Sequence, residues 1–162
     1  MPQAHTAFME LQVDQWFNTE APLQLADLRG RVVVVHVFQM LCPGCVAHGL
    51  PQAQRIAQAF EGRDLTLIGL HSVFEHHAVM TPAALQVFLH EYRIGFPVGV
   101  DQAGDPGPLP RTMQAWQLGG TPSLLVFDRQ GRLRLKHLGQ VDDLPLGALL
   151  GELLALPASV PA

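Results

Sequence analysis

The sequence predicts a single α/β domain in which helices cover a mixed β-sheet. The first strands expected along the chain are separated by helical segments, and such crossovers imply parallel pairing. The last two expected strands are joined by a short turn, which implies an antiparallel hairpin. The chain has 162 residues, 48% of them hydrophobic, which is enough for one core. We therefore expect one domain over residues 1–162, with its core at about 16–156 and a flexible tail at 157–162.

The first half of the chain predicts two buried strands with a helix between them. Residues Val32–Phe38 are β-branched and nearly continuously apolar, which is typical of a strand buried on both faces. Apolar residues then recur at helical spacing over 46–60, and Gly62 is a plausible stop. Pro51 lies inside this helix and predicts a kink. A second buried strand is expected at 65–71.

The second half predicts smaller elements. Thr81 and Pro82 have the form of a helix N-cap followed by proline at the first helical position. The apolar stripe of that helix is expected at Leu85, Phe88, Leu89 and Tyr92. The remaining elements are expected in the order of a short strand at 96–100, a loop at 102–110, one or two helical turns at 111–117, a hairpin of 123–127 with 132–137, and a helix around 146–153.

The two cysteines, Cys42 and Cys45, lie at the joint between the first buried strand and its helix. A bridge between them would enclose almost no chain and would restrict the unfolded state very little. Cys42 falls just before the helix, where free N–H groups and the helix dipole stabilise a thiolate. Cys45 is one turn on and can attack a mixed disulfide formed at Cys42. Pro43 suits an early helical position, and Gly44 adds no side-chain charge, so the motif predicts redox chemistry.

The order of the motifs resembles a known superfamily. The Cys42–Cys45 motif is followed by Phe96-Pro97-Val98 with Asp101, and then by Gly120-Thr121-Pro122 ahead of a strand. This order is similar to that of the thioredoxin-like redoxins. The likeness is greatest to their thiol–disulfide oxidoreductase branch of the cytochrome-maturation type, which borders the alkyl hydroperoxide reductase (peroxiredoxin) group.

The resemblance implies a thioredoxin-like fold with the Cys-x-x-Cys motif at a helix N-terminus. It implies that Cys42 is the nucleophile and that Cys45 resolves the mixed disulfide. It also implies that Pro122 follows a cis bond and packs against the disulfide, and that the backbone of Thr121 aligns a substrate strand. Taken without the resemblance, Thr121-Pro122 would be interpreted as an ordinary trans turn.

At four positions the chain has a residue other than the one usual in the related groups. Leu41 replaces the tryptophan usual before the first cysteine, and Pro51 lies one residue farther from Cys45 than the usual helix proline. Gln39 replaces the threonine or serine that peroxiredoxins place three residues before their peroxidatic cysteine, and Val35 replaces their helper proline. We therefore expect disulfide exchange rather than a dedicated peroxidase, with an antioxidant reduction of hydroperoxides by Cys42 left open.

His36 lies six residues before Cys42, where thioredoxins have a buried carboxylate that moves protons at the inner cysteine. One interpretation is that His36 does this work as a general base with a pKa near neutral. The other is a core histidine whose ring is satisfied by a backbone carbonyl.

A second class of function uses the same cysteines. Cys42, Cys45 and His48 are possible soft-metal ligands, with a loop histidine (His71, His76 or His77) as a fourth, as in a copper- or zinc-binding chaperone. Structural zinc usually takes four ligands, and the chain has no second cysteine pair. The preferred interpretation is therefore an enzyme without metal or other cofactor, in which these histidines have no assigned role.

Charge and hydropathy limit the partners. The net charge is −4 with neutral histidines, and no Lys/Arg block predicts nucleic-acid binding. The longest nearly apolar stretch, 32–41, is too short to span a membrane. Residues 1–10 lack the pattern of a secretory signal, so we expect a cytoplasmic protein. The expected partners are a disulfide-bearing protein, a small thiol or a hydroperoxide, with a cellular thiol reductase as electron donor.

Overall fold

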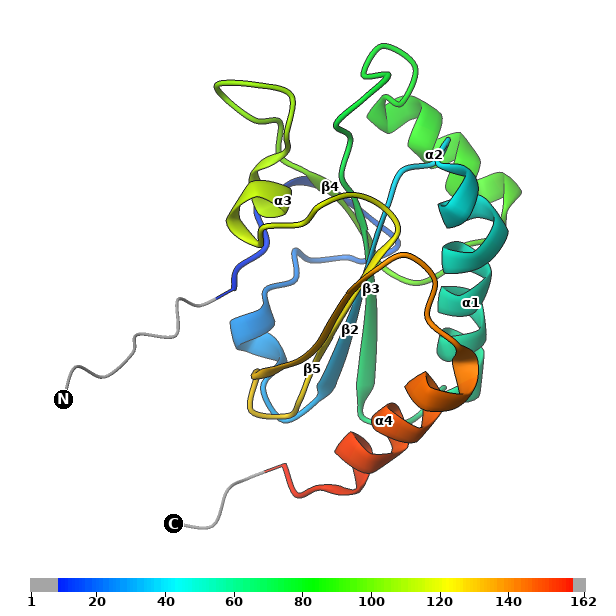
Figure 1. Cartoon of the computed structure of the whole chain (residues 1–162), viewed down its shortest axis with the longest axis vertical. Coiled ribbons are helices and arrows are strands. Elements are labelled where there is room, and N and C mark those ends of the chain that lie inside the picture. The colour runs from blue at the N-terminus through cyan, green and yellow to red at the C-terminus, as the bar shows by residue number, and fades with distance from the viewer. Residues whose placement is uncertain (1–8, 159–162) are drawn as a thin grey trace, which may run out of the picture.

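The computed structural model describes residues 9–158 and shows a six-stranded mixed sheet with strand order β1-β4-β3-β2-β5-β6 (Figure 1). The elements are β1 (Val13–Phe17), the 3-10 helix η1 (Leu25–Leu28), β2 (Val32–Phe38), the π-helix η2 (Cys45–Gly49), α1 (Leu50–Ala59), β3 (Leu65–His71), α2 (Pro82–Glu91), β4 (Val98–Asp101), α3 (Arg111–Ala115), β5 (Ser123–Phe127), β6 (Leu133–Leu138) and α4 (Asp143–Ala155). The predicted α/β class with a mixed sheet is confirmed.

The central strand β2 pairs in parallel with β3 and antiparallel with β5. All seven of its residues are buried, because helices cover both faces of the sheet. The β5–β6 pair is the predicted antiparallel hairpin, and β3 pairs in parallel with β4. The two buried strands have the bounds that their apolar runs predicted, since a continuous β-branched run suits a strand with no solvated face.

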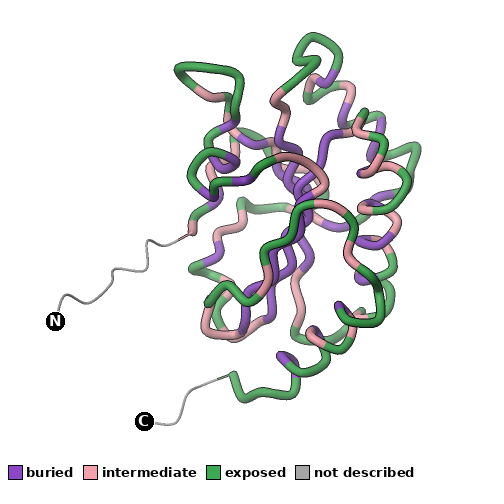
Figure 2. The backbone as a smooth tube through the Cα atoms, in the orientation of Figure 1, coloured by how far each residue is buried: buried purple, intermediate pink, exposed green. Residues whose placement is uncertain are grey.

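Two layers of helices enclose the sheet. Helices α1, α2 and α4 lie on one face, while η1 and α3 lie on the other (Figure 1). Alternate residues of β2 point to the two sides, so that Val34 and Phe38 pack in one hydrophobic cluster and Val33 and Val37 in the other. The buried positions follow the middle strands through the centre of the molecule (Figure 2). This rigid centre fixes the end of β2 from which the cysteines follow.

The structure differs from the sequence-based expectations in three elements. Strand β1 was not predicted, and it pairs antiparallel with β4 at the edge of the sheet. The short strand expected at 96–100 lies at Val98–Asp101. Tyr92 does not belong to the buried stripe of α2, because it follows the last helical residue and is 54% exposed. Thr81, in contrast, caps α2 as predicted, with its hydroxyl oxygen accepting from the Ala84 N–H.

Asp101 ends β4 and is buried. Its carboxylate accepts hydrogen bonds from the backbone N–H groups of Thr112 and Met113, at 2.8 and 3.1 Å. The Ser72 hydroxyl donates to the same carboxylate at 2.8 Å. Free N–H groups at the start of a helix favour an anion. Asp101 therefore joins the start of α3 to the segment that follows β3, beside the carboxyl end of the sheet.

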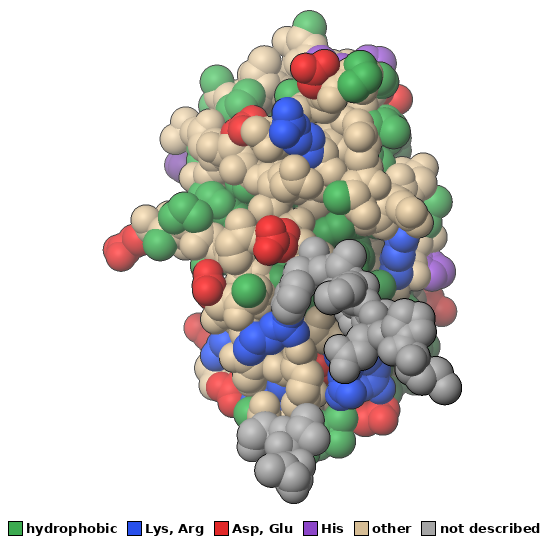
Figure 3. All heavy atoms as spheres, turned by 90° about the vertical axis from the view of Figure 1, so that its left-hand side faces the viewer, with side chains coloured by type: hydrophobic (Ala, Val, Ile, Leu, Met, Phe, Trp, Pro, Cys, Tyr) green, Lys and Arg blue, Asp and Glu red, His purple; other side chains and the backbone are tan. Residues whose placement is uncertain are grey.

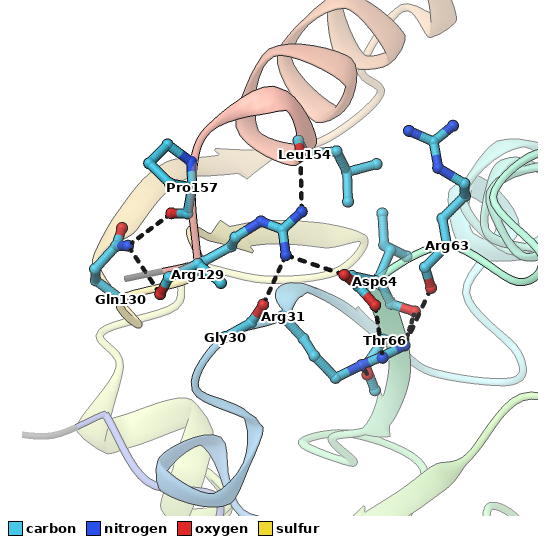
Figure 4. Close-up of polar contacts among 11 residues, drawn as sticks. Gly30, Arg31, Arg63, Asp64, Thr66, Arg129, Gln130, Leu154 and Pro157 are labelled. Carbon is cyan, nitrogen blue, oxygen red and sulfur yellow. Dashed lines mark hydrogen bonds and ion pairs between the residues drawn. The ribbon is translucent and has the colours of Figure 1, made fainter. Parts of the chain in front are cut away.

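At the opposite end of the sheet, charged residues connect α4 to the starts of β2 and β3 (Figure 4). Arg129 donates to the carbonyls of Gly30 and Leu154, at 2.9 and 2.8 Å, and lies 3.2 Å from the Asp64 carboxylate. Arg31 pairs with the other oxygen of Asp64 at 3.5 Å. Because Asp64 precedes β3 and Cys42 follows the parallel strand β2, this network lies away from the cysteines and has a structural role.

The surface carries mixed charge. On the face shown in Figure 3, acidic and basic side chains are interspersed among uncharged ones. Within residues 9–158, none of the helices combines the length and apolar character needed to cross a bilayer. Residues 1–8, on which the expectation about a leader depends, and residues 159–162 of the expected tail lie outside the described residues.

Candidate active site

The two cysteines follow β2 at its carboxyl end and precede α1. Figure 1 shows the segment that joins these two elements. The Val46 N–H donates to the Cys42 carbonyl at 3.0 Å, so helical hydrogen bonding begins at Cys42. Cys45 is the first residue of η2 and is completely buried, while Cys42 is half-buried, and both thiols are free. The Cys45 N–H points toward the Cys42 sulfur, 3.4 Å away. The structure therefore has the predicted Cys-x-x-Cys motif at a helix N-terminus.

The pKa values of the two thiols are shifted in opposite directions. Burial alone would raise the pKa of Cys42, but hydrogen bonds from the Cys45 and Thr121 side chains and from the Cys45 and Gly44 backbone outweigh it. The pKa of Cys42 is therefore lowered. Burial, together with the neighbouring Cys42 thiol, raises the pKa of Cys45 to about 12. Since only the thiolate is nucleophilic, Cys42 is the sulfur that ionises more readily, and Cys45 is the one that stays protonated at neutral pH.

These acidities predict selective alkylation. In the reduced native protein, iodoacetamide is expected to modify Cys42 with a half-maximal rate at a pH below that of an unperturbed cysteine, because only the thiolate reacts. Cys45 should stay unmodified throughout the neutral range. Peptide mass spectrometry over a pH series identifies the modified residue, and urea-denatured protein, in which both cysteines should react, is the control. Equal modification of the two native cysteines at pH 7 would contradict the assignment.

The loop before β5 completes the site. The Thr121–Pro122 bond is cis, as the resemblance implied. The Thr121 carbonyl lies 3.6 Å from the Cys42 sulfur. A Cβ on Gly44 would lie 3.3 Å from Cδ of Pro122, so the absence of a side chain at Gly44 lets the proline ring approach the helix start. Pro43 is exposed beside them.

Neither interpretation of His36 is met. The ring is almost completely buried, and burial lowers its pKa to about 4, well below the near-neutral value expected of a general base. Its Nε2 has no hydrogen-bond partner in the part of the chain that the structure describes, so no carbonyl satisfies this nitrogen. The ring lines a pocket of about 300 Å³ that Gly49, Pro122 and Gln52 also line. His36 is thus a neutral residue beneath the helix.

The helix is widened where a kink was predicted at Pro51. Residues Cys45–Gly49 form a π-helical turn, in which the Leu50 N–H donates to the Cys45 carbonyl, five residues earlier. Pro51 is then near the start of α1, where its missing N–H does not interrupt the backbone hydrogen bonds of the α-helix. A π-helical turn contains more residues than an α-helical turn. It therefore accommodates the one-residue shift of Pro51 relative to the usual position in related proteins.

The remaining histidines within residues 9–158 do not assemble a metal site. His71 is buried, burial lowers its pKa to about 4, and its Nε2 accepts the Met40 N–H at 3.1 Å. His48, His76 and His77 are exposed. Within residues 9–158, no group of three or more histidine, cysteine, aspartate or glutamate side chains could hold a metal ion. The alternative of a copper- or zinc-binding chaperone therefore has no assembled ligand set in the described structure.

Sequence reasoning missed the role of Gln39 and Glu75. Gln39 is completely buried, and its side-chain amide connects the segment after β3 with the Thr121 side chain. In the sequence, Gln39 stood out only as a departure from the peroxiredoxin pattern. A polar residue at the end of an otherwise apolar buried strand was the available signal, because a buried amide needs partners.

A family model and two solved structures match most of the chain. The sequence model of the AhpC/TSA family matches residues 5–136. A crystal structure of a thioredoxin-like superfamily protein is 58% identical, with a TM-score of 0.90, and the match covers 93% of this chain and 97% of that chain. A thiol-disulfide isomerase from Corynebacterium glutamicum is 56% identical, with a TM-score of 0.86, over 91% and 95% of the two chains.

The curated relatives are much longer proteins. NHL repeat-containing protein 2 of Gallus gallus is 37% identical over 129 residues, which are 78% of this chain and 16% of the relative. Protein SUPPRESSOR OF QUENCHING 1, chloroplastic, of Arabidopsis thaliana is 28% identical over 144 residues, or 83% of this chain and 12% of the relative. The chain thus spans about a sixth or less of the length of the curated relatives that it matches.

Proposed function

Since this chain belongs to the AhpC/TSA family within the thioredoxin-like superfamily, we propose that it is a thiol–disulfide oxidoreductase cycling between a Cys42–Cys45 disulfide and a dithiol. One observation carries the proposal. The half-buried sulfur with the lowered pKa lies one helical turn before a buried sulfur with a pKa of about 12. Thiol–disulfide exchange needs this order of reactivity, with one exposed attacking thiolate and one protected resolving thiol.

The proposed exchange has two steps. The Cys42 thiolate attacks one sulfur of a substrate disulfide, forms a mixed disulfide and releases the other substrate sulfur as a thiolate, which takes up a proton. Cys45 then loses its proton and attacks the Cys42 sulfur, which releases the second substrate thiol and forms the Cys42–Cys45 disulfide. Two electrons pass from the protein to the substrate. A cellular thiol reductase, as electron donor, returns the protein to the dithiol.

The surroundings of Cys42 favour a polypeptide substrate. Leu41, next to Cys42, is 54% exposed, and Leu138 is 55% exposed. A Cβ on Gly119 or Gly120 would lie 3.5 Å from Leu138, so this leucine flanks the loop that leads to Thr121. Exposed apolar side chains next to the reactive sulfur and beside the cis-proline loop suit an uncharged segment of a protein. We propose that the backbone of Thr121 aligns such a segment, while small disulfides and hydroperoxides are secondary substrates.

His36 is given no proton-transfer role in this scheme. A group with a pKa of about 4 is a poor acceptor for the proton of a thiol whose pKa is about 12, because efficient general bases have pKa values near the operating pH. The proton of Cys45 is proposed to leave once Cys42 is in a mixed disulfide and no longer contributes to raising the Cys45 pKa. We also propose that the protein is located in the cytoplasm.

The test is the reduction potential of the purified protein, measured against glutathione and dithiothreitol buffers, combined with an insulin-reduction assay and metal analysis. We expect a reversible two-electron transition and catalysed reduction of insulin. A potential near the thioredoxin range, roughly −270 mV, would indicate a cytoplasmic reductase, and a much more oxidising value would indicate an oxidant. Absence of a reversible transition, with stoichiometric copper or zinc bound, would contradict the proposal.

A further inference from the structure

Glu75 is an exposed acidic residue whose position is fixed from the interior of the protein. It belongs to the segment after β3, which hydrogen bonds hold against the end of β2. The Ser72 N–H donates to the Phe38 carbonyl at 3.0 Å, and the Phe74 N–H donates to Oε1 of Gln39 at 3.2 Å. The Glu75 carboxylate accepts from Nε2 of Gln39 at 3.3 Å. A completely buried amide therefore holds an exposed carboxylate in place.

The same buried residue, Gln39, contacts the nucleophile and the cis-proline loop. Its carbonyl accepts the Cys42 N–H at 3.0 Å, and its Nε2 lies 3.5 Å from the Thr121 hydroxyl oxygen. The Thr121 carbonyl in turn lies 3.6 Å from the Cys42 sulfur. Glu75 and Cys42 are thus both bonded to Gln39, one through its side chain and the other through its backbone. The length of one glutamine separates the carboxylate from the residue that reacts.

The charge of Glu75 is not neutralised by an ion pair. Among residues 9–158, no arginine, lysine or histidine side chain forms an ion pair with it, whereas Asp64, Asp128 and Asp143 each pair with an arginine. A carboxylate has about four acceptor positions, and Gln39 uses one of them. Because exposed carboxylates are ionised at neutral pH, Glu75 offers a negative charge and acceptor capacity to a partner.

We propose that Glu75 is a specificity residue that favours polypeptide disulfides flanked by a lysine or an arginine. The inference deepens the proposed function and rests on it in taking Cys42 as the attacking group. The otherwise uncharged segment that suits Leu41 and Leu138 then carries one basic side chain, on the side that faces the segment after β3. A fixed charge at the rim of a site acts mainly by speeding the encounter with an oppositely charged partner. Its signature is a rate effect that salt removes.

The first test measures the charge felt at Cys42 in the Cys45→Ser background, where a mixed disulfide persists. The probes are two methanethiosulfonates of similar size, one carrying a trimethylammonium group and the other a sulfonate. The Cys42 thiolate attacks the thiol-derived sulfur of the probe, forms a mixed disulfide with it and expels methanesulfinate. The ratio of the two rates reports the local charge, because any change in the fraction of thiolate cancels from the ratio.

Glu75→Gln removes the charge but keeps an oxygen that can accept from Gln39. We expect it to lower the cation-to-anion rate ratio about fourfold at about 10 mM salt, and to leave the ratio unchanged at about 1 M salt, where charges are screened within about 3 Å. Glu61→Gln is the matched control, because Glu61 is also exposed but follows the far end of α1. It should change the ratio less than about twofold.

The second test uses the dithiol protein and two peptide disulfides that differ in one residue beside the cysteine, lysine or glutamate. In single-turnover reduction at about 10 mM salt, we expect the parent protein to reduce the lysine peptide faster. Glu75→Gln should lower the ratio of the two second-order rate constants by about the same factor as it lowers the probe ratio. The inference is overturned if Glu75→Gln leaves either ratio unchanged, or if Glu61→Gln lowers it as much.

The two tests separate this inference from the proposed function. If neither peptide is reduced while the probe ratio falls as expected, the proposed function is contradicted and Glu75 is still the source of the charge felt at Cys42. Conversely, reduction of both peptides by the parent protein at equal rates would support the proposed function and overturn the inference.

Discussion

Replacement of Cys42 by serine is expected to abolish disulfide exchange, lowering its rate by at least about a thousandfold. A serine hydroxyl is not ionised at neutral pH and cannot replace a thiolate as the attacking group. Cys45→Ser should have a different result, because Cys42 can still attack and only the second step is lost. This variant should accumulate a mixed disulfide that persists until an external thiol releases it.

Intact-protein mass spectrometry after incubation with glutathione disulfide distinguishes the two variants. We expect one glutathione adduct on Cys42 in Cys45→Ser, and no adduct on the native Cys42→Ser protein, since Cys45 is completely buried and burial, the largest cause of its raised pKa, does not depend on Cys42. Cys42→Ser unfolded in urea is the matched control, in which Cys45 becomes reactive. An adduct that formed on Cys45 in the native Cys42→Ser protein as fast as on Cys42 would reverse the assigned roles.

The parts of the fold that were predicted correctly are those with a strong local pattern. Strands β2 and β3 were predicted with their observed bounds because both faces are buried, and the apolar run shows this directly. Strand β1 was missed because its five residues, VDQWF, include polar side chains and none is fully buried. Such an edge strand is defined by its pairing with β4, more than eighty residues later in the sequence, and that pairing has no local signal.

In the candidate site, too, the features with a local sequence pattern were predicted and those that depend on long-range contacts were not. Cys42 and Cys45 were identified from their spacing and their place before a helix, and the cis bond before Pro122 came only from the resemblance. The bonds of Gln39 to Glu75 and Thr121 join residues 36 and 82 positions apart, which no periodicity predicts. The near-neutral pKa expected of His36 differs from the structure because burial lowers it to about 4. The sequence placed His36 on a buried strand but did not show how completely its ring would be shielded from solvent.

Gly49→Ala is expected to destabilise the protein strongly, because the added methyl group would meet a buried ring. Gly49 ends the π-helical turn with ordinary helical dihedral angles, so the backbone itself would accept alanine. A Cβ there, however, would lie 2.4 Å from Cε1 and 2.9 Å from Nε2 of His36, and 3.2 Å from Cβ of Pro122. The His36 ring is buried and stacks on Phe38, with 5.8 Å between the ring centroids, so it can make room only by shifting into the pocket that it lines.

We therefore expect Gly49→Ala to lower the free energy of unfolding by about 3 kcal/mol, the upper part of the range for overpacked cores. Gly151→Ala is the matched control, because Gly151 is an exposed residue within α4 and a Cβ there would meet nothing within 4 Å. That variant should instead be more stable by up to about 1 kcal/mol, since alanine is the better helix former. Urea unfolding followed by circular dichroism measures both changes.

The source of the strain is tested by removing the His36 ring. In a His36→Ala background, the new methyl group at Gly49 enters the space that the imidazole has left, so Gly49→Ala should destabilise the protein much less than it does alone. Equal destabilisation in both backgrounds would show that the π-helical turn itself rejects the side chain. Rescue by His36→Ala would instead show that position 49 lacks a side chain because the His36 ring occupies the adjoining space.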